Sequence, residues 1–504
     1  MSVIIEQRAD ERSMVILTRR ENMLDSLKNK ELFLNVRLVY VVLMLLYALL
    51  RQNVTALQPF LMQGWLNMAI TLFAGVLILW DVLCFRNFLK TKYIWILASV
   101  VFLTAVVSVV YFRYSFVDNI KACINMVINF FVLYSIGSDM TRTRVDWEMQ
   151  VLGNALCLAW GIAAAVSVYM YVADIFYTQT SYLWYEPTEI LQGFVRNDDG
   201  HAVMRLWGVF VDPNFASNVS LVAILFSVYI ICVNRVKWLR IVHGVNIVFQ
   251  YLYIVLSGSR MSLLVLCLLT FVGGWYQILP KLKKLKHPTV REIVAVLLAV
   301  VLTVCCYCSV QLTKTVLPYV QYGVSQLKTE QSTPSEDENT QDENDSTGVE
   351  NLDRTDISEK SDVSNGRFSL WAEGFRIFEN SPLFGVGPRS YRVMAKELDS
   401  TMKISFKSIH NSYLELLMGN GIVGLILMIL FFALCAKDAI LLRYRGSDST
   451  FRVGILMLIV LGCLGAGMFI SSLFYYLSGL SIFVFLALGY AVNLMHSEPK
   501  TQKN

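Results

Sequence analysis

Charged residues are scarce in this sequence of 504 residues, of which 16% are charged and 56% are hydrophobic. A soluble protein carries about 25% charged residues, so this composition excludes an ordinary soluble globular protein. Long apolar runs take the place of the missing charge. Segments 93–112 and 290–310, for example, have about the 20 apolar residues that a helix needs to cross a bilayer. We therefore expect a polytopic membrane protein.

Alternation of polar and apolar residues is missing from these runs. Each run is also far longer than the roughly 9–11 residues of a transmembrane β-strand. Inside a bilayer, where the backbone must satisfy its own hydrogen bonds, the remaining architecture is a bundle of helices. The predicted fold class is therefore all-α.

Cysteine is missing from the one long polar segment of the chain. The ten cysteines fall in or beside apolar runs, so no disulfide framework is indicated. Cys305, Cys306 and Cys308 resemble a metal-binding cluster, but no histidine lies near them in the sequence. We favour their interpretation as small apolar side chains.

Ionisable residues are sparse in the apolar runs. Asp81, Lys121 and Asp174 lie near the ends of runs, and Glu415 lies one turn into another. An ion-coupled transporter normally has acidic groups or broken helices at mid-depth. Neither feature is predicted here, which weakens the transporter hypothesis.

Hydropathy predicts twelve transmembrane helices. They cover approximately residues 33–51, 60–83, 93–112, 120–137, 151–177, 215–233, 241–257, 260–279, 290–312, 412–436, 453–473 and 478–495. If the N-terminus is cytoplasmic, every inner connection has more Lys and Arg than its outer neighbours, apart from one tie. The positive-inside rule then predicts that both termini are cytoplasmic.

The predicted organisation has five parts. A cytoplasmic N-terminal segment, 1–37, precedes helices one to nine in residues 38–312. A large extracytoplasmic loop, 313–411, separates these from helices ten to twelve in residues 412–495. Residues 496–504 form a cytoplasmic tail.

The large loop itself has two parts. Residues 330–362 contain twelve acidic and two basic residues and no aromatic residue, a composition that predicts disorder. Calcium binding is an alternative, although the spacing of the acidic residues does not match an EF-hand loop. The following stretch predicts an amphipathic helix with apolar positions at Phe368, Trp371, Phe375 and Phe378. We expect this helix to lie on the outer leaflet or to cap a cavity between the helices.

Polar side chains gather at four places on the predicted outer side. These are segment 196–217, with Arg196, His201, Arg205, Asp212 and Asn214; the segment Ser-Gly-Ser-Arg that ends at Arg260; segment 385–392, with Arg389 and Arg392; and the start of the tenth helix, with His410 and Asn411. Grouped arginines predict an anionic ligand, because guanidinium groups suit phosphate oxygens. We also expect the glycines of segment 385–388 to leave backbone N–H groups open for such a ligand.

Simpler interpretations exist for each of these groups. An arginine at a helix end often reaches only for the membrane interface. Asp212 or Asn214 could cap a helix. Gly421 and Gly424, at helical spacing behind His410, are more often helix-packing contacts than ligand contacts.

Taken together, these residues resemble the O-antigen ligase and polysaccharide polymerase superfamily of bacterial envelope enzymes. The family's motif follows a long outer loop and consists of His, then Asn, Ser or Gln, nine residues, Gly, two residues and Gly. Here it is His410, Asn411, Gly421 and Gly424. The segments Asp-Pro-Asn, Ser-Gly-Ser-Arg and Gly-Val-Gly-Pro-Arg-Ser-Tyr precede it in the expected order. The resemblance covers roughly residues 40–495, and the acidic insert is longer than the pattern needs.

The resemblance implies a metal-independent glycosyltransferase without a cofactor, located in the bacterial inner membrane. A glycan carried on a polyprenyl diphosphate moves to a sugar hydroxyl of an acceptor on the outer face. The expected catalytic residues are His410, for the acceptor hydroxyl, and Arg260, which with Arg389 faces the diphosphate. The residues expected to bind substrate are Arg205, Asp212, Asn214, Arg389, Arg392 and Asn411.

The expected partners are a polyprenyl-diphosphate-linked oligosaccharide, membrane lipid, a flippase and a chain-length regulator, with no nucleic acid. We favour a polymerase, whose acceptor is another lipid-linked repeat unit, because the acidic loop offers no docking site for an anionic core. The alternatives are an O-antigen ligase acting on a lipid A core, a transporter or flippase of lipid-linked oligosaccharide, and a non-catalytic scaffold.

Overall fold

The computed structural model describes residues 29–182, 187–198, 201–282, 284–331, 352, 366–445 and 447–496. Its helices are α2 (Lys30–Asn53), α3 (Gln58–Leu61), α4 (Gly64–Trp80), α5 (Asn87–Lys90), α6 (Ile94–Val110), α7 (Phe116–Val127), α8 (Arg142–Leu156), α9 (Ile162–Val172), α10 (Pro213–Val233), α11 (Lys237–Leu256), α12 (Arg260–Ile278), α13 (Pro288–Gln331), α14 (Arg367–Phe378), α15 (Ser390–Leu398), α16 (Ser412–Arg445), α17 (Thr450–Gly467) and α18 (Gly479–His496). Its strands are β1 (Phe176–Ser181), β2 (Thr188–Asp198) and β3 (His201–Gly208).

The prediction of a polytopic helical membrane protein is confirmed. Eleven helices of the described part are long and apolar enough to span a membrane, and the predicted third span appears as the shorter helix Ile94–Val110. Three π-helical segments, Asp81–Phe85, Ile128–Ser135 and Cys157–Gly161, continue α4, α7 and α8 without a break in the chain's helical course. The acidic insert 330–362 lies almost entirely outside the described residues.

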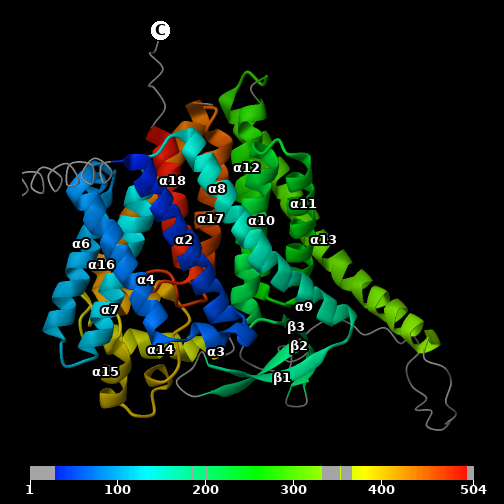
Figure 1. Ribbon diagram of the computed structural model, residues 1–504, viewed down its shortest axis with the longest axis horizontal. Coiled ribbons are helices and arrows are strands. Elements are labelled where there is room, and N and C mark those ends of the chain that lie inside the picture. The colour runs from blue at the N-terminus through cyan, green and yellow to red at the C-terminus, as the bar shows by residue number, and fades with distance from the viewer. Residues whose placement is uncertain are drawn as a thin grey trace, which may run out of the picture.

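The helices form one bundle around α18. Every residue of α18 from Gly479 to Met495 is buried, because α17, the π-helical segment after α7 and α2 pack on it. α2 begins and α18 ends at the same end of the bundle, while the sheet, α14 and α15 lie at the opposite end, which we call the sheet end (Figure 1). This is the arrangement that an even number of membrane crossings requires.

A small sheet at the sheet end was not predicted. β2 pairs antiparallel with both β1 and β3, in the order β1-β2-β3. Gly193, with a φ of 83°, sits at a register shift where a Cβ atom would lie 2.0 Å from the carbonyl oxygen of Ile175. Hydropathy windows sized for a membrane span cannot detect strands this short, which explains the omission.

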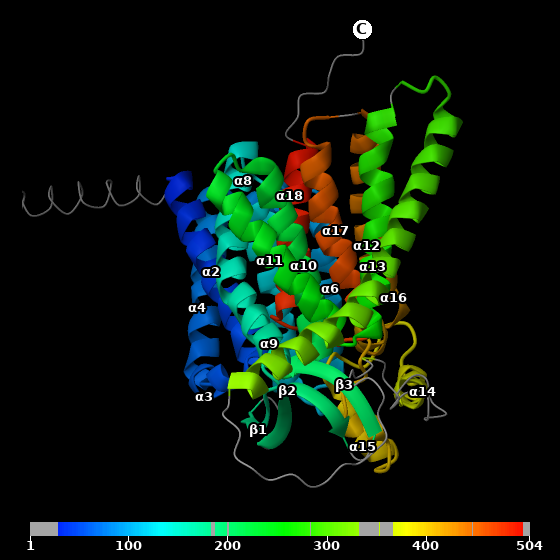
Figure 2. The ribbon, with the colours of Figure 1, turned by 90° about the vertical axis from the view of Figure 1, so that its right-hand side faces the viewer.

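Two predicted helix ends also differ from the structure. α8 begins at Arg142 instead of 151, because Thr141 caps it and its charged residues are paired, with Glu148 bonded to Arg37 and Arg144. α13 continues to Gln331 instead of ending at 312. Its second part passes the outer side of α9, next to the sheet (Figure 2), where the Gln321 amide donates to the carbonyl of Tyr171 at 2.9 Å.

Candidate functional site

His410 lies at the sheet end, immediately before α16. Its backbone is left-handed, with a φ of 51°, and its side chain is accessible to solvent. The next residue, Asn411, accepts hydrogen bonds from the backbone N–H groups of Tyr413 (3.0 Å) and Leu414 (2.9 Å). Asn411 therefore caps α16, and its amide oxygen fixes where the helix begins after His410.

The connection between α17 and α18 holds the start of α16 from one side. The Asn411 N–H donates to the Ser471 hydroxyl at 3.1 Å, and the Ser412 hydroxyl accepts from the N–H of Ser472 at 3.1 Å. These contacts join segments that are 60 residues apart in the sequence. The position of His410 thus depends on the start of α16 and on the connection between α17 and α18.

Helix α14 holds the same segment from the other side. The Trp371 indole N–H donates to the carbonyl of Ile409 at 3.1 Å. Gly374 lets the helix approach closely, since a Cβ atom there would lie 2.5 Å from Ile409 and 3.1 Å from Leu414. This packing brings Arg367, the first residue of α14, to His410, with its guanidinium 5.7 Å from the ring centre of Phe469.

The electrostatic surroundings of His410 show which residues share its site. Shielding by the surrounding protein is the largest cause that lowers the pKa of His410 below its ordinary value. The positive charges of Arg367, Lys407 and Arg392 lower this pKa further, while Asp212 raises it. The imidazole is therefore neutral at neutral pH although its side chain remains accessible.

Arg260 belongs to the same group. Burial and the positive charge of Arg260 lower the pKa of Arg367, and Asp212 opposes them. The predicted residues His410, Arg260 and Asp212 thus lie within electrostatic reach of Arg367, and Arg392 lies within electrostatic reach of His410. Arg367 itself was not predicted, because an arginine between a polar insert and an amphipathic helix has no distinguishing sequence signal.

Arg205 and Asn214 hold in place the segments that carry Asp212 and Arg260. Arg205 is 8% exposed, and its guanidinium donates to the carbonyl of Ser257 and to the Asn214 side chain, each at 2.6 Å. Asp212 accepts from the Asn214 N–H at 2.8 Å and caps α10. These bonds tie β3 to the start of α10 and to the turn that carries Arg260, so Arg205 and Asn214 are occupied by protein groups.

Arg389 lies in a second cluster with Glu415 and Tyr476. Its guanidinium is 3.3 Å from the Glu415 carboxylate and lies 3.9 Å from the ring centre of Tyr476, whose hydroxyl donates to the same carboxylate at 2.8 Å. Arg392 interacts electrostatically with both His410 and Arg389 and so lies between the two groups. Arg389 is therefore largely committed to protein partners, and Arg392 interacts with both Arg389 and His410.

The expectation that the glycines of segment 385–388 leave N–H groups open is wrong. The N–H of Val386 donates to the carbonyl of Met418 at 2.8 Å, and that of Gly387 to the carbonyl of Gly419 at 3.1 Å. The N–H of Gly385 donates to the carbonyl of Ser381 at 2.8 Å. Two of these groups bind α16 and the third closes the turn, so the turn serves packing and does not form an anion cradle.

One membrane helix is broken, although near its start and not at the mid-depth where the sequence predicts no broken helix. α16 is interrupted at Gly421, which has φ 64° and ψ −168°. The turn before α15 fills the interruption, because the N–H groups of Ile422 and Val423 donate to the carbonyls of Pro382 (2.9 Å) and Leu383 (3.1 Å). The break is thus closed by backbone and does not open a polar cavity.

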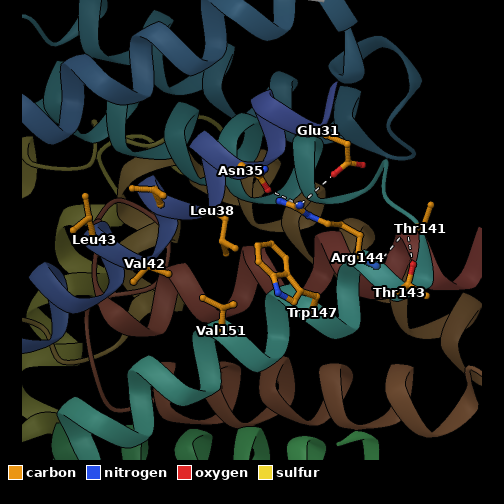
Figure 3. A pocket seen from close by; sticks show the side chains of 11 residues that line it. Glu31, Asn35, Leu38, Val42, Leu43, Thr141, Thr143, Arg144, Trp147 and Val151 are labelled. Atoms are coloured by element: carbon orange, nitrogen blue, oxygen red, sulfur yellow. Dashed lines mark hydrogen bonds and ion pairs between the residues drawn. The ribbon is translucent and has the colours of Figure 1, made fainter. Parts of the chain in front are cut away.

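A cavity lies at the opposite end of the bundle, between α2 and α8 (Figure 3). Its volume is about 720 Å³, and its walls are mainly apolar. Its one guanidinium, that of Arg144, is bonded to Glu148 (2.8 Å), Asn35 (2.7 Å) and Glu31 (3.3 Å). This cavity is separate from the His410 group, and its charges are balanced among protein residues.

Two further residues of the predicted polar segment 196–217 are Arg196 and His201. Arg196 forms an ion pair with Asp174 beside the sheet. The side chain of His201 lies outside the described part of the chain. Among the described residues, no group of three or more His, Cys, Asp or Glu side chains is placed to hold a metal ion.

Comparison with known proteins gives one family. Residues 245–429 match the family model described as O-Antigen ligase. The matched segment runs from α11 into α16 and contains Arg260, Arg367, Arg389 and His410. None of the curated proteins that were compared with the chain matches it.

Proposed function

On the premise that residues 245–429 place the chain in the O-antigen ligase and polymerase superfamily, we propose that it is an envelope polysaccharide polymerase. In this proposal, a glycan on a polyprenyl diphosphate carrier is transferred to a sugar hydroxyl of an acceptor repeat unit. The sheet end faces the outside of a bacterial inner membrane, and both termini are cytoplasmic. The basic connections at the opposite end, such as Arg86, Lys90 and Lys92, support this orientation.

The convergence of His410, Arg260 and Arg367 is the observation that carries the proposal. These residues come from three separate helix starts, yet they share one accessible site with Asp212. A neutral imidazole beside two guanidinium groups suits a reaction in which a hydroxyl loses a proton while a diphosphate gains negative charge.

The proposed step forms one bond and breaks one. The acceptor hydroxyl oxygen bonds to the anomeric carbon, and the bond from that carbon to the diphosphate oxygen breaks, with its electron pair leaving on the diphosphate. His410 takes the hydroxyl proton, a contribution of about 10²–10⁴-fold for a well-placed base. Arg260 and Arg367 stabilise the leaving diphosphate, and loss of one such group typically costs about 10²–10³-fold.

The remaining predicted residues are proposed to act in support. Asp212 faces Arg367 and His410 and keeps both oriented, while Arg205 and Asn214 hold the turn before Arg260. Arg392 is the remaining candidate for contact with the anionic substrate, since it is partly exposed and lies toward His410. Arg389 and Asn411 are proposed to position the turn and the start of α16.

The test uses purified protein in lipid nanodiscs, supplied with lipid-linked repeat units. Wild-type protein should produce longer glycan, while the variants His410→Ala and Arg260→Gln should not. Arg376→Gln is the matched control, because Arg376 lies on the exposed face of α14 and should leave elongation unchanged. Wild-type chain lengths from both site variants would overturn the proposal.

The same preparation separates the polymerase from its alternatives. Transfer to a lipid A core without elongation of repeat units would indicate a ligase. The broken helix α16 is the one observation that favours a transporter or flippase, since interrupted helices often form transport sites. Movement of the lipid-linked sugar across vesicles without any new glycosidic bond would identify that function.

A further inference from the structure

We propose that α14 and the turn after it are a membrane anchor, in which Phe368, Phe375, Leu383 and Phe384 contact the acyl chains of the leaflet at the sheet end. These four side chains are the exposed large apolar residues of segment 366–384, with exposed fractions of 63%, 50%, 58% and 51%. We call them the aromatic edge. The proposed partner is phospholipid, and the surface itself does not depend on the proposed catalytic function.

The faces of α14 support this assignment. Leu370, Gly374 and Ile377 are buried against the protein. On another side, Glu373 accepts a hydrogen bond from the Ile404 N–H at 2.8 Å, so that side faces the loop before His410. Two residues along a helix lie about 160° apart around its axis, so Phe375 points away from that loop. The exposed phenylalanines therefore form a separate apolar flank, which water would surround if lipid did not.

The aromatic edge continues directly into the lipid-facing surface of α16. The hydrogen bonds from Ile422 and Val423 to the carbonyls of Pro382 and Leu383 fix the turn against this helix. Ile422 is 39% exposed, and Ile426, one turn further along, is 57% exposed, as expected for side chains in contact with acyl chains. Leu383 and Phe384 extend that apolar surface, since a Cβ atom on Gly421, the neighbour of Ile422, would meet the backbone of both.

The length of α16 gives the depth of this contact. Beyond the break at Gly421, the 24 residues from Ile422 to Arg445 measure about 36 Å, whereas the hydrocarbon core is about 30 Å thick. The part after the break is therefore long enough to cross the core alone, and its exposed side chains Ile426, Ile429 and Leu430 are apolar. The break at Gly421 then lies at the edge of the hydrocarbon. Leu383 and Phe384 meet the acyl chains there, and α14 lies among the head groups.

This anchor has a consequence for the site, and that part rests on the proposed function. Trp371 and Arg367 are on the same short helix as the aromatic edge, and Trp371 is bonded to the carbonyl before His410. A helix held at the membrane surface would keep Arg367 at the height where the diphosphate of a membrane-bound carrier lies. Lipid contact and site geometry are thereby coupled through α14.

The test places the photoreactive amino acid p-benzoylphenylalanine at position 375 or 384 of the full-length protein in phosphatidylethanolamine–phosphatidylglycerol nanodiscs. Irradiation followed by mass spectrometry should give lipid adducts at both positions. The matched control is the same substitution at Phe406, which is 65% exposed but lies beyond Ile404, toward the loop side of α14. We expect several-fold fewer lipid adducts there.

Two outcomes would overturn the proposal. An absence of lipid adducts at both 375 and 384 would show that the aromatic edge faces water. Adducts to a second copy of the chain would show that it is a self-association surface. Because this assay needs no glycan transfer, its failure can be distinguished from a failure of the proposed function.

Discussion

The substitution Gly421→Ala tests how the break in α16 is maintained. Gly421 has φ 64° and ψ −168°, a conformation that is essentially restricted to glycine. An added Cβ atom would lie 2.3 Å from the carbonyl carbon and oxygen of Leu383 and 2.4 Å from the backbone nitrogen of Phe384. All three contacts are to backbone, so no side chain can rotate away. The turn that is wedged into α16 has to move.

The expected loss of stability follows from these contacts. The backbone conformation alone costs about 1–3 kcal/mol for a residue other than glycine. Displacement of the turn also endangers four hydrogen bonds, those donated by Val386, Gly387, Ile422 and Val423. At about 0.5–1.5 kcal/mol each, they add about 2–6 kcal/mol. We expect a clearly lower apparent melting temperature and, because α14 and Arg389 flank this turn, loss of glycan elongation.

The assay is thermal unfolding in detergent, followed by tryptophan fluorescence, together with glycan elongation in nanodiscs. Gly75→Ala is the matched control, since Gly75 lies in α4 and a Cβ atom there would meet nothing within 4 Å. That variant should have an unchanged or slightly raised melting temperature. Wild-type stability and activity in Gly421→Ala would refute the reasoning that the wedge needs glycine.

Three other predictions concern the site and the loop. Elongation should fall as pH drops, because His410 is protonated. Arg367→Gln should move this fall in activity to higher pH, because the substitution removes a positive charge that lowers the pKa of His410. A pH–rate profile that is the same in the variant and the wild type would argue against His410 as the base. Arg205→Gln should lower the melting temperature, since its two charge-assisted hydrogen bonds are worth about 1.5–3 kcal/mol each. Arg260→Gln should mainly reduce glycan transfer. Equal effects of the two substitutions on melting temperature and on transfer would contradict these distinct roles. Replacing 330–362 with a short Gly-Ser linker should leave folding and elongation intact, since loop length costs little closure entropy; complete loss of activity in correctly inserted protein would place the insert in the site.

Local sequence determined the membrane class and the number of helices. A span is recognised from its own apolar residues, because each transmembrane helix satisfies its backbone hydrogen bonds internally. The amphipathic helix α14 was predicted for the same reason, from the spacing of its aromatic residues. The motif from His410 to Gly424 was also visible in the sequence, since all its residues lie within one short stretch of the chain. None of these features needs information from a distant part of the chain.

Only the tertiary structure decided how these features are combined. Arg367 lies in the site because Trp371 and Gly374 pack α14 against Ile409, a contact between segments more than 30 residues apart. Arg389 was expected to face the diphosphate, but its guanidinium contacts Glu415 and Tyr476 instead. A side chain's availability to a ligand depends on which partners the fold brings within hydrogen-bonding distance.

The glycines show the same division. The sequence predicts a flexible turn at 385–388 and a motif glycine at 421, but it does not reveal that they fit together. In the fold, the backbone of the turn enters the break in α16 and uses the N–H groups that seemed free for an anion. Glycine is needed at both places because two backbones approach more closely than a Cβ atom allows. That requirement arises from a contact between distant segments, so only the folded chain could show it.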